Sequence, residues 1–157
     1  MPEKLQYIIR KAAPADNPQI RNIVSASLAD FGITVEFSGL DAAIASAGLA
    51  GSSNAIELVA EVNGEIAACL AVERLDTQQG KLFGFHVNPL FRGRGLGRQL
   101  LLQCMEIARQ RGFLILHLHT WDTMQSAIHL YESTGWLQAE NPPPESGANR
   151  AYMLKLI

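Results

Sequence analysis

The sequence is poor in cysteine and has no long apolar run. Only Cys69 and Cys104 occur among its 157 residues, without CxxC or HxxxH spacing. Both cysteines lie in apolar stretches, so we expect buried free thiols instead of a disulfide or a metal site. No stretch of about 18 apolar residues could span a membrane. The first residues lack a secretion signal's apolar core, so a cytoplasmic location is the default expectation.

A strong net charge is also absent, since the formal value is -2. This balance gives no reason to expect nucleic acid or an anionic membrane as a partner. The composition, 48% hydrophobic and 18% charged, suits one globular domain over residues 1–157. Residues 1–78 carry five basic and ten acidic side chains, and residues 79–157 carry eight and five. The acidic first half would suit a cationic amine, or is simply the usual surface of a soluble protein.

Apolar periodicity predicts a mixed α/β fold around one sheet. Helices are expected within residues 13–32, with Asp16 as a cap, within 39–53, from the glycine-rich turn at 92–97 to Gly112, and over 123–134. Strands are expected over residues 5–10, 55–62, 65–76, 80–87, 113–121, 136–140 and 149–157. Asn63-Gly64 predicts a tight hairpin, and the strand–helix–strand unit at 80–120 predicts a parallel pair.

The turn Arg92-Gly93-Arg94-Gly95-Leu96-Gly97 directly follows a strand and opens a helix. It is not the dinucleotide fingerprint GxGxxG, because Arg98 stands where the third glycine is needed, and no GxxxxGK[ST] loop occurs. The first amides of a helix have no intrahelical partner, and glycine lets a ligand approach them closely. Together with the nearby arginines, this pattern predicts a site for an anion such as a pyrophosphate.

Arg92-x-x-Gly95-x-Gly97 resembles the pyrophosphate-binding signature of the GCN5-related N-acetyltransferases. The segment AIHLYESTGW (127–136) is similar to the second signature of that family, and IIRKAAPAD (8–16) to its opening strand and turn. The resemblance implies a mostly antiparallel mixed sheet, flanked by helices and splayed between its fourth and fifth strands. Those strands would be residues 80–87 and 114–120. The implied co-substrate is acetyl-CoA, and no metal is implied.

The resemblance also implies roles for particular residues. Tyr131 would be the general acid that protonates the leaving thiolate, although it could instead be a core aromatic with a hydrogen-bonded phenol. The acetyl carbonyl would lie beside a strand amide near Val87. The pantetheine arm and the pyrophosphate would be bound by Phe85, His86, Val87, Arg92, Gly93, Arg94, Gly95, Leu96, Gly97 and Arg98.

The general base stays open. Some members of the family place a glutamate on the fourth strand where this sequence has Lys81, which cannot act as a carboxylate base. Glu73 and His86 are the first alternatives, His119 is another, and a water chain without a dedicated base is equally tenable. His119 alternates with His117 along its strand, but no further metal ligand stands at suitable spacing. Met124 stands where the family has an asparagine.

The expected function is transfer of an acetyl group to the primary amine of a small, amino-acid-like substrate. A catalytically silent acyl-CoA sensor and a protein acetyltransferase are the alternatives. Residues 28–50 are expected to form the wall opposite the cofactor. Trp121 and Trp136 line a pocket or pack the core, with packing favoured for Trp136. By analogy, a homodimer could form through an apolar sheet edge at residues 151–157.

Overall fold

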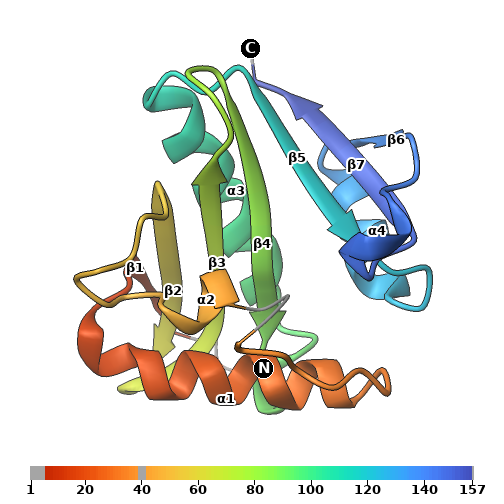
Figure 1. Ribbon diagram of the computed structural model, residues 1–157. Helices are drawn as coiled ribbons and strands as arrows, with labels where there is room; N and C mark the ends of the chain where they lie inside the picture. The colour runs from red at the N-terminus through yellow and green to blue at the C-terminus, as the bar shows by residue number, and fades with distance from the viewer. Residues whose placement is uncertain (1–5, 39–41, 157) are drawn as a thin grey trace, which may run out of the picture.

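The protein is built on one seven-stranded sheet with strand order β1-β2-β3-β4-β5-β7-β6 (Figure 1). The structure, a computed structural model, describes residues 6–38 and 42–156. The strands are β1 (Ile8–Lys11), β2 (Ile56–Val62), β3 (Glu65–Arg74), β4 (Gln79–Val87), β5 (Ile115–Thr120), β6 (Leu137–Ala139) and β7 (Arg150–Lys155). The helices are α1 (Asn17–Ala29), α2 (Ala42–Ala45), α3 (Leu96–Gln110) and α4 (Gln125–Ser133), with short 3-10 turns at Pro14–Asp16, Pro89–Phe91 and Pro144–Ser146. The predicted mixed, mostly antiparallel fold is confirmed.

Helices cover both faces of the sheet. On the face that we call the front, α1 and α2 pack against the alternating residues Val59, Cys69 and Ala71. On the back, α3 and α4 pack against the intervening positions, among them Leu70 and Leu82. Both faces of β2 and β3 are therefore buried, which explains why these strands read as nearly continuous apolar runs.

The predicted turns follow from residues that tolerate positive φ. Asn63 and Gly64 have φ values of 50° and 81° and join β2 to β3 as a tight antiparallel hairpin. Gly112, at φ 87°, follows the end of α3, as the sequence predicts.

β4 and β5 form a parallel pair that separates after four residue pairs. Gln79 to Leu82 pair with Ile115 to Leu118, and β5 then continues beside β7 without β4. The two strands diverge below this point in Figure 1, and we call the opening the fork. The expected splay between the fourth and fifth strands is confirmed. Within residues 6–38 and 42–156, the backbone of β4 from residue 83 to residue 87 has no strand partner on the side that faces β5.

Gly84 marks a bulge in β4 just beyond the fork's apex. The register between β3 and β4 shifts between Cys69 and Ala71, and Gly84 adopts φ +62°. A Cβ atom at this position would lie 2.5 Å from Cδ1 of Ile44. Glycine therefore allows both the backbone conformation and the close seat of α2 on β4.

Two buried polar side chains hold the segment around α2 in place. The Asn17 amide donates to the carbonyls of Ala45 and Ala47, at 2.8 and 2.9 Å. The Glu57 carboxylate accepts from the amide of Gly48 and the hydroxyl of Ser52. The predicted short helix is thus present as a single turn, although residues 39–41 of that prediction lie outside the described residues.

Two expectations need correction. Asp16 stands at the N-cap of α1 but makes no capping hydrogen bond. Its carboxylate accepts two hydrogen bonds from the Arg10 guanidinium, at 2.7 and 2.9 Å, and one from the Ala13 amide. Hydrogen bonds from the charged guanidinium are stronger than those that the first amides of α1 could donate. The segment 151–157 was expected at a sheet edge, but β7 lies between β5 and β6. The last residue of that segment is outside the described residues.

Replacing Gly84 with alanine should destabilise the fold strongly. Alanine is strained at a positive φ, and its methyl group would clash with Ile44. Together these two costs should lower the free energy of unfolding by roughly 2–5 kcal/mol. Gly32→Ala is the matched control, because Gly32 has φ +72° but open space at its Cβ position. It should lose only about 1–2 kcal/mol. Urea unfolding measures both, and equal losses would contradict the proposed close contact with Ile44.

The Arg10–Asp16 ion pair should make stability depend on pH. The Arg10 guanidinium lowers the pKa of Asp16 below its ordinary value of 3.8, although burial opposes this. The pair therefore stabilises the folded state above about pH 4, and this contribution is lost as the pH falls through the lowered folded-state pKa. Asp16→Asn should lose roughly 1.5–3 kcal/mol at pH 7, and its gap to wild type should close in acid.

Urea titrations between pH 7 and pH 3 measure that gap. Glu65→Gln, at an exposed carboxylate in the hairpin, is the control and should follow wild type throughout. If the difference in free energy of unfolding between Asp16→Asn and wild type stays constant down to pH 3, the charge of the Asp16 carboxylate does not stabilise the contact between β1 and the start of α1.

Candidate active site

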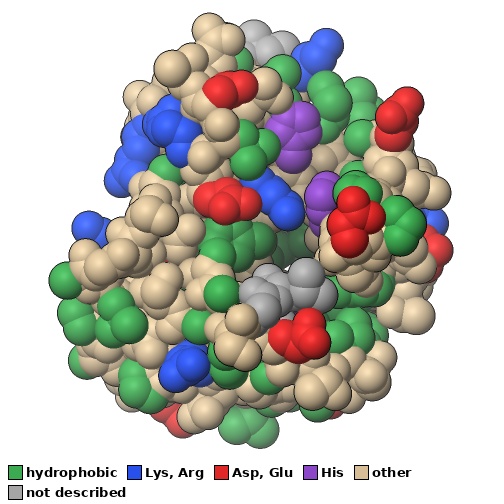
Figure 2. Space-filling view, viewed as in Figure 1, with side chains coloured by type: hydrophobic (Ala, Val, Ile, Leu, Met, Phe, Trp, Pro, Cys, Tyr) green, Lys and Arg blue, Asp and Glu red, His purple; other side chains and the backbone are tan. Residues whose placement is uncertain are grey.

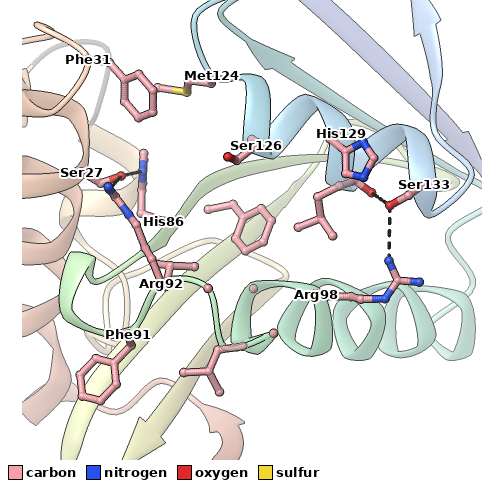
Figure 3. A pocket seen from close by; sticks show the side chains of 18 residues that line it. Ser27, Phe31, His86, Phe91, Arg92, Arg98, Met124, Ser126, His129 and Ser133 are labelled. Carbon is pink, nitrogen blue, oxygen red and sulfur yellow. Dashed lines mark hydrogen bonds between the residues drawn. The ribbon is translucent and has the colours of Figure 1, made fainter.

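A cavity of about 520 Å³ lies where the fork opens, between the end of β4, the start of α3 and helix α4 (Figure 3). Its size is that of a small-molecule site. It is lined by Ser27, Phe31, Phe85, His86, Val87, Phe91, Arg92, Gly93, Gly95, Leu96, Gly97, Arg98, Met124, Ser126, Ala127, His129, Leu130 and Ser133. The structure thus gathers nearly all the predicted cofactor residues around one cavity, Arg94 being the exception.

The glycine turn presents bare backbone to this cavity. Gly93 and Gly95 have φ values of 77° and 80°, and Gly95 is the N-cap of α3. A Cβ atom at either residue would meet nothing within 4 Å, so the space beside them is open. At Gly97 a Cβ would lie 3.1 Å from Cγ2 of Val87, so this glycine serves helix–strand packing. The unpaired first-turn amides of α3 and the room around Gly95 fit a diphosphate.

Positive charge surrounds the turn. Arg92 pairs with Asp30 at 2.8 Å and approaches the Ser27 hydroxyl at 3.4 Å, which ties the turn to the end of α1. Arg98 donates to Ser133 on α4 at 3.3 Å. Arg94 is exposed and has no ion-pair or hydrogen-bond partner among the described residues. The cavity therefore has cations on two sides that could approach a bound anion.

His86 enters the cavity from β4 and is neutral at physiological pH. Its Nδ1 lies 2.9 Å from the Ser27 hydroxyl, a bond drawn in Figure 3. Burial, with a smaller contribution from the charge of Arg92, lowers the pKa of His86 to about 4. A group with so low a pKa is a weak base, so it would accept little of an ammonium's proton.

Tyr131 is not one of the lining residues of the cavity, but it belongs to an aromatic cluster that includes the lining residue Phe85. Its ring centroid is 6.2 Å from Phe85, 5.8 Å from Trp136 and 6.0 Å from Tyr152. Its side chain is buried, and burial raises its pKa above the ordinary 10.0. Within the described part of the chain its hydroxyl has no hydrogen-bond partner, whereas the hydroxyl of Tyr152 bonds Glu132 and Arg150. The alternative of a core tyrosine held by a hydrogen bond is thus not observed.

The other base candidates do not line the cavity. Glu73 is half-buried near the end of β3, opposite Lys81 on β4. His119 lies on β5, one residue beyond the last pair with β4. Burial, followed by the charges of Lys81 and His117, lowers its pKa, and its buried Nδ1 has no hydrogen-bond partner among residues 6–38 and 42–156. Both residues lie on the front face, Glu73 before the last β4–β5 pair and His119 just beyond it.

Several cavity residues carry no signal in the sequence. Ser27 comes from α1, and His129 and Ser133 come from α4. They meet the glycine turn only because α1 and α4 converge on the end of β4. Met124, where the family's asparagine was expected, also lines the cavity. Phe31, which lies within the expected wall of residues 28–50, also lines the cavity.

Trp136 packs in the core and both cysteines are buried free thiols, as the sequence predicts. Trp136 is 2% exposed and packs in the core, while Trp121 donates to the carbonyl of Gly147 at 2.6 Å. Both cysteines are free and buried, and burial raises their pKa values to about 12.

Over the described residues, no three His, Cys, Asp or Glu side chains group as metal ligands. None of the helices described there has the length and apolarity to cross a bilayer.

Comparison with known proteins finds acetyltransferases of the same fold, and the matched family segment includes the glycine turn. Residues 23–136 match the acetyltransferase (GNAT) family. The uncharacterized N-acetyltransferase YjgM of Escherichia coli K12 is 28% identical over 144 residues, 82% of this chain and 81% of that protein. A GNAT-family acetyltransferase from Staphylococcus aureus Mu50 has the same fold, with a TM-score of 0.86 at 17% identity over 97% of this chain and 100% of the other.

A further structure, PaiA N-acetyltransferase from Thermoplasma acidophilum in complex with coenzyme A, has a TM-score of 0.75 at 16% identity. It covers 96% of this chain and 99% of that chain. At these identities the two structures establish the fold alone, whereas the family match spans most of the sequence. A splayed sheet, a glycine turn at the start of α3 and the match over residues 23–136 together show that this chain belongs to the GNAT family of acetyltransferases.

Proposed function

We propose that the protein transfers an acetyl group from acetyl-CoA to the primary amine of a small, amino-acid-like acceptor, by direct attack in a ternary complex. The observation that carries this proposal is the continuity of one groove. It begins at the free amides of α3 and continues along the unpaired edge of β4 toward the fork. A ligand with an anionic head and an extended amide-containing arm matches both parts.

The residues would bind the co-substrate in two ways. The amides from Arg94 to Arg98 would hold the diphosphate, with the arginine side chains adding charge. The unpaired backbone of β4 at Phe85, His86 and Val87 would pair with the amides of the pantetheine arm much as a neighbouring strand would. The apolar side chains of the cavity would exclude water from the arm. A strand amide of β4 would polarise the thioester carbonyl as its oxygen gains charge.

In the transfer, the acceptor nitrogen forms a bond to the acetyl carbon and the carbon–sulfur bond breaks. The ammonium loses one proton, and the departing thiolate takes up one proton. Tyr131 would supply the second proton, because its phenol is protonated at every physiological pH and its hydroxyl has no competing partner among the described residues. Solvent would restore the phenol.

Accepting the first proton does not require a strong base in the cavity itself. His86 is too weakly basic for this task, and Glu73 lies outside the cavity. We propose that water at the front of the fork accepts the proton. A catalytically silent acyl-CoA sensor would have the same groove but would release no thiol, which separates the two functions experimentally. A protein acetyltransferase would instead turn over peptides in preference to small amines.

Substituting Gly95 should weaken coenzyme A binding. In Gly95→Ala the new methyl group would enter the open space assigned to the diphosphate, and we expect roughly a tenfold or larger rise in Kd. Gly112→Ala is the matched control at the other end of α3, since Gly112 has φ +87° and equally open surroundings. Isothermal titration with coenzyme A should show an unchanged Kd for this control. Unchanged binding by Gly95→Ala would contradict the assignment of the turn.

Removing the Tyr131 hydroxyl should slow turnover without weakening cofactor binding. We expect Tyr131→Phe to lower kcat by roughly 100-fold, the usual effect of losing a general acid, with an unchanged Kd for coenzyme A. Tyr152→Phe is the control, because it removes a phenol from the same aromatic cluster. Thiol release from acetyl-CoA measures both variants. Equal rates for Tyr131→Phe and wild type would assign Tyr131 to packing.

A further inference from the structure

We infer that the acceptor carries a carboxylate beside its amine, and that Lys81 binds this carboxylate on the front face of the sheet at the fork. The inference rests on the proposed function and names the class of its second substrate. Three features of Lys81 support it: its position beside the fork, the open face around it, and the lack of a salt bridge with Glu73.

Among the described residues, no helix covers the front face at this end of the sheet. In β5 the residues alternate strictly, with Leu116, Leu118 and Thr120 buried on the back and the intervening side chains half-exposed. Helix α1 crosses the lower ends of the strands in Figure 1 and leaves the upper part of the face open. Figure 2 shows histidine, cationic and acidic side chains gathered on this face beside a hollow. An acceptor can therefore reach the sheet here without displacing a helix.

Lys81 lies next to the place where the strands part. Its Cα pairs with that of His117 on β5, and only the pair of Leu82 with Leu118 follows before the fork opens. His119 is the next front-face residue of β5 beyond that last pair. A small molecule bound to Lys81 would thus extend its other end over the fork's apex, where the acetyl group would arrive.

Lys81 is half-buried but has no ion-pair or hydrogen-bond partner in the part of the chain that the structure describes. Its Cα is paired with that of Glu73 on β3, yet the two side chains form no salt bridge. The ammonium instead acts electrostatically on His119 across the β4–β5 pair. Its charge therefore lies near the fork, where a ligand could neutralise it.

His117 and His119 lie beside Lys81 on the same face of the sheet. The Nε2 of His117 lies 2.7 Å from the side-chain oxygen of Gln79, which fixes its ring. The buried Nδ1 of His119 has no partner among the described residues. The nearby positive charge disfavours an ammonium at the fork, so it favours an acceptor amine that arrives neutral and a carboxylate that stays ionised.

Paired acceptors test this inference. Thiol release from acetyl-CoA is measured with several α-amino acids and with their carboxamides, which keep the amine but lack the carboxylate. Wild type should prefer the acids by roughly 10- to 100-fold in kcat/KM, the usual effect of one charge-assisted bond. Lys81→Met should lose this preference, Lys81→Arg should keep it, and Lys81→Glu should favour the carboxamides. The Kd for coenzyme A should not change in any of the three.

Lys11→Met is the control, since Lys11 is an exposed lysine on β1, three strands from β4. It should retain the wild-type preference. Equal turnover of acids and carboxamides by wild type, or a preference that survives in Lys81→Met, would overturn the inference while leaving acetyl transfer intact. Failure of every acceptor, with no coenzyme A binding, would overturn the proposed function and this inference together.

Discussion

The architecture depends on the separation of β4 from β5. A continuous sheet would satisfy the backbone groups of both strands and leave no opening between them. Here the pair ends at Leu82 and Leu118, and β5 continues with β7 alone. Unpaired backbone is tolerated because it borders a cavity where water or a ligand can complete the hydrogen bonds. The same break brings the start of α3 and the start of α4 to opposite sides of one groove.

The separation is stabilised locally on both faces. Gly84 shapes β4 just beyond the apex and admits Ile44 from the front. On the back, Phe85 and Tyr131 pack across the opening, and Tyr131 in turn contacts Trp136 and Tyr152. These contacts join β4 to α4 and β7 where no strand pairing does. Rigid support of this kind allows a groove to be preformed.

Burial decides which site groups carry charge. His86 and Tyr131 are both kept neutral at physiological pH, one as a weak base and the other as a protonated phenol. Fixed charge is confined to arginines around the turn and to the open front face around Lys81. The lysine and arginine side chains of the cavity lining, Arg92 and Arg98, lie at the turn, and apolar residues such as Phe85 and Leu130 line it farther along, which suits a neutral pantetheine arm. Arg92 also links the turn to the end of α1 through its salt bridge with Asp30. The same arginine therefore borders the anion site and contacts α1.

The sequence by itself determined the order of the elements, the Asn63-Gly64 hairpin, the end of α3 at Gly112 and the glycine turn, because each depends on local periodicity or on backbone conformations open to few residues. It also identified the residues of β4 and α3 that line the cavity. Only the tertiary structure decided that Ser27, His129 and Ser133 join them, that Asp16 binds Arg10 instead of capping its helix, and that β7 lies inside the sheet. Those outcomes depend on contacts between segments far apart in the chain, where packing and charge pairing, which leave no local pattern, select the partner.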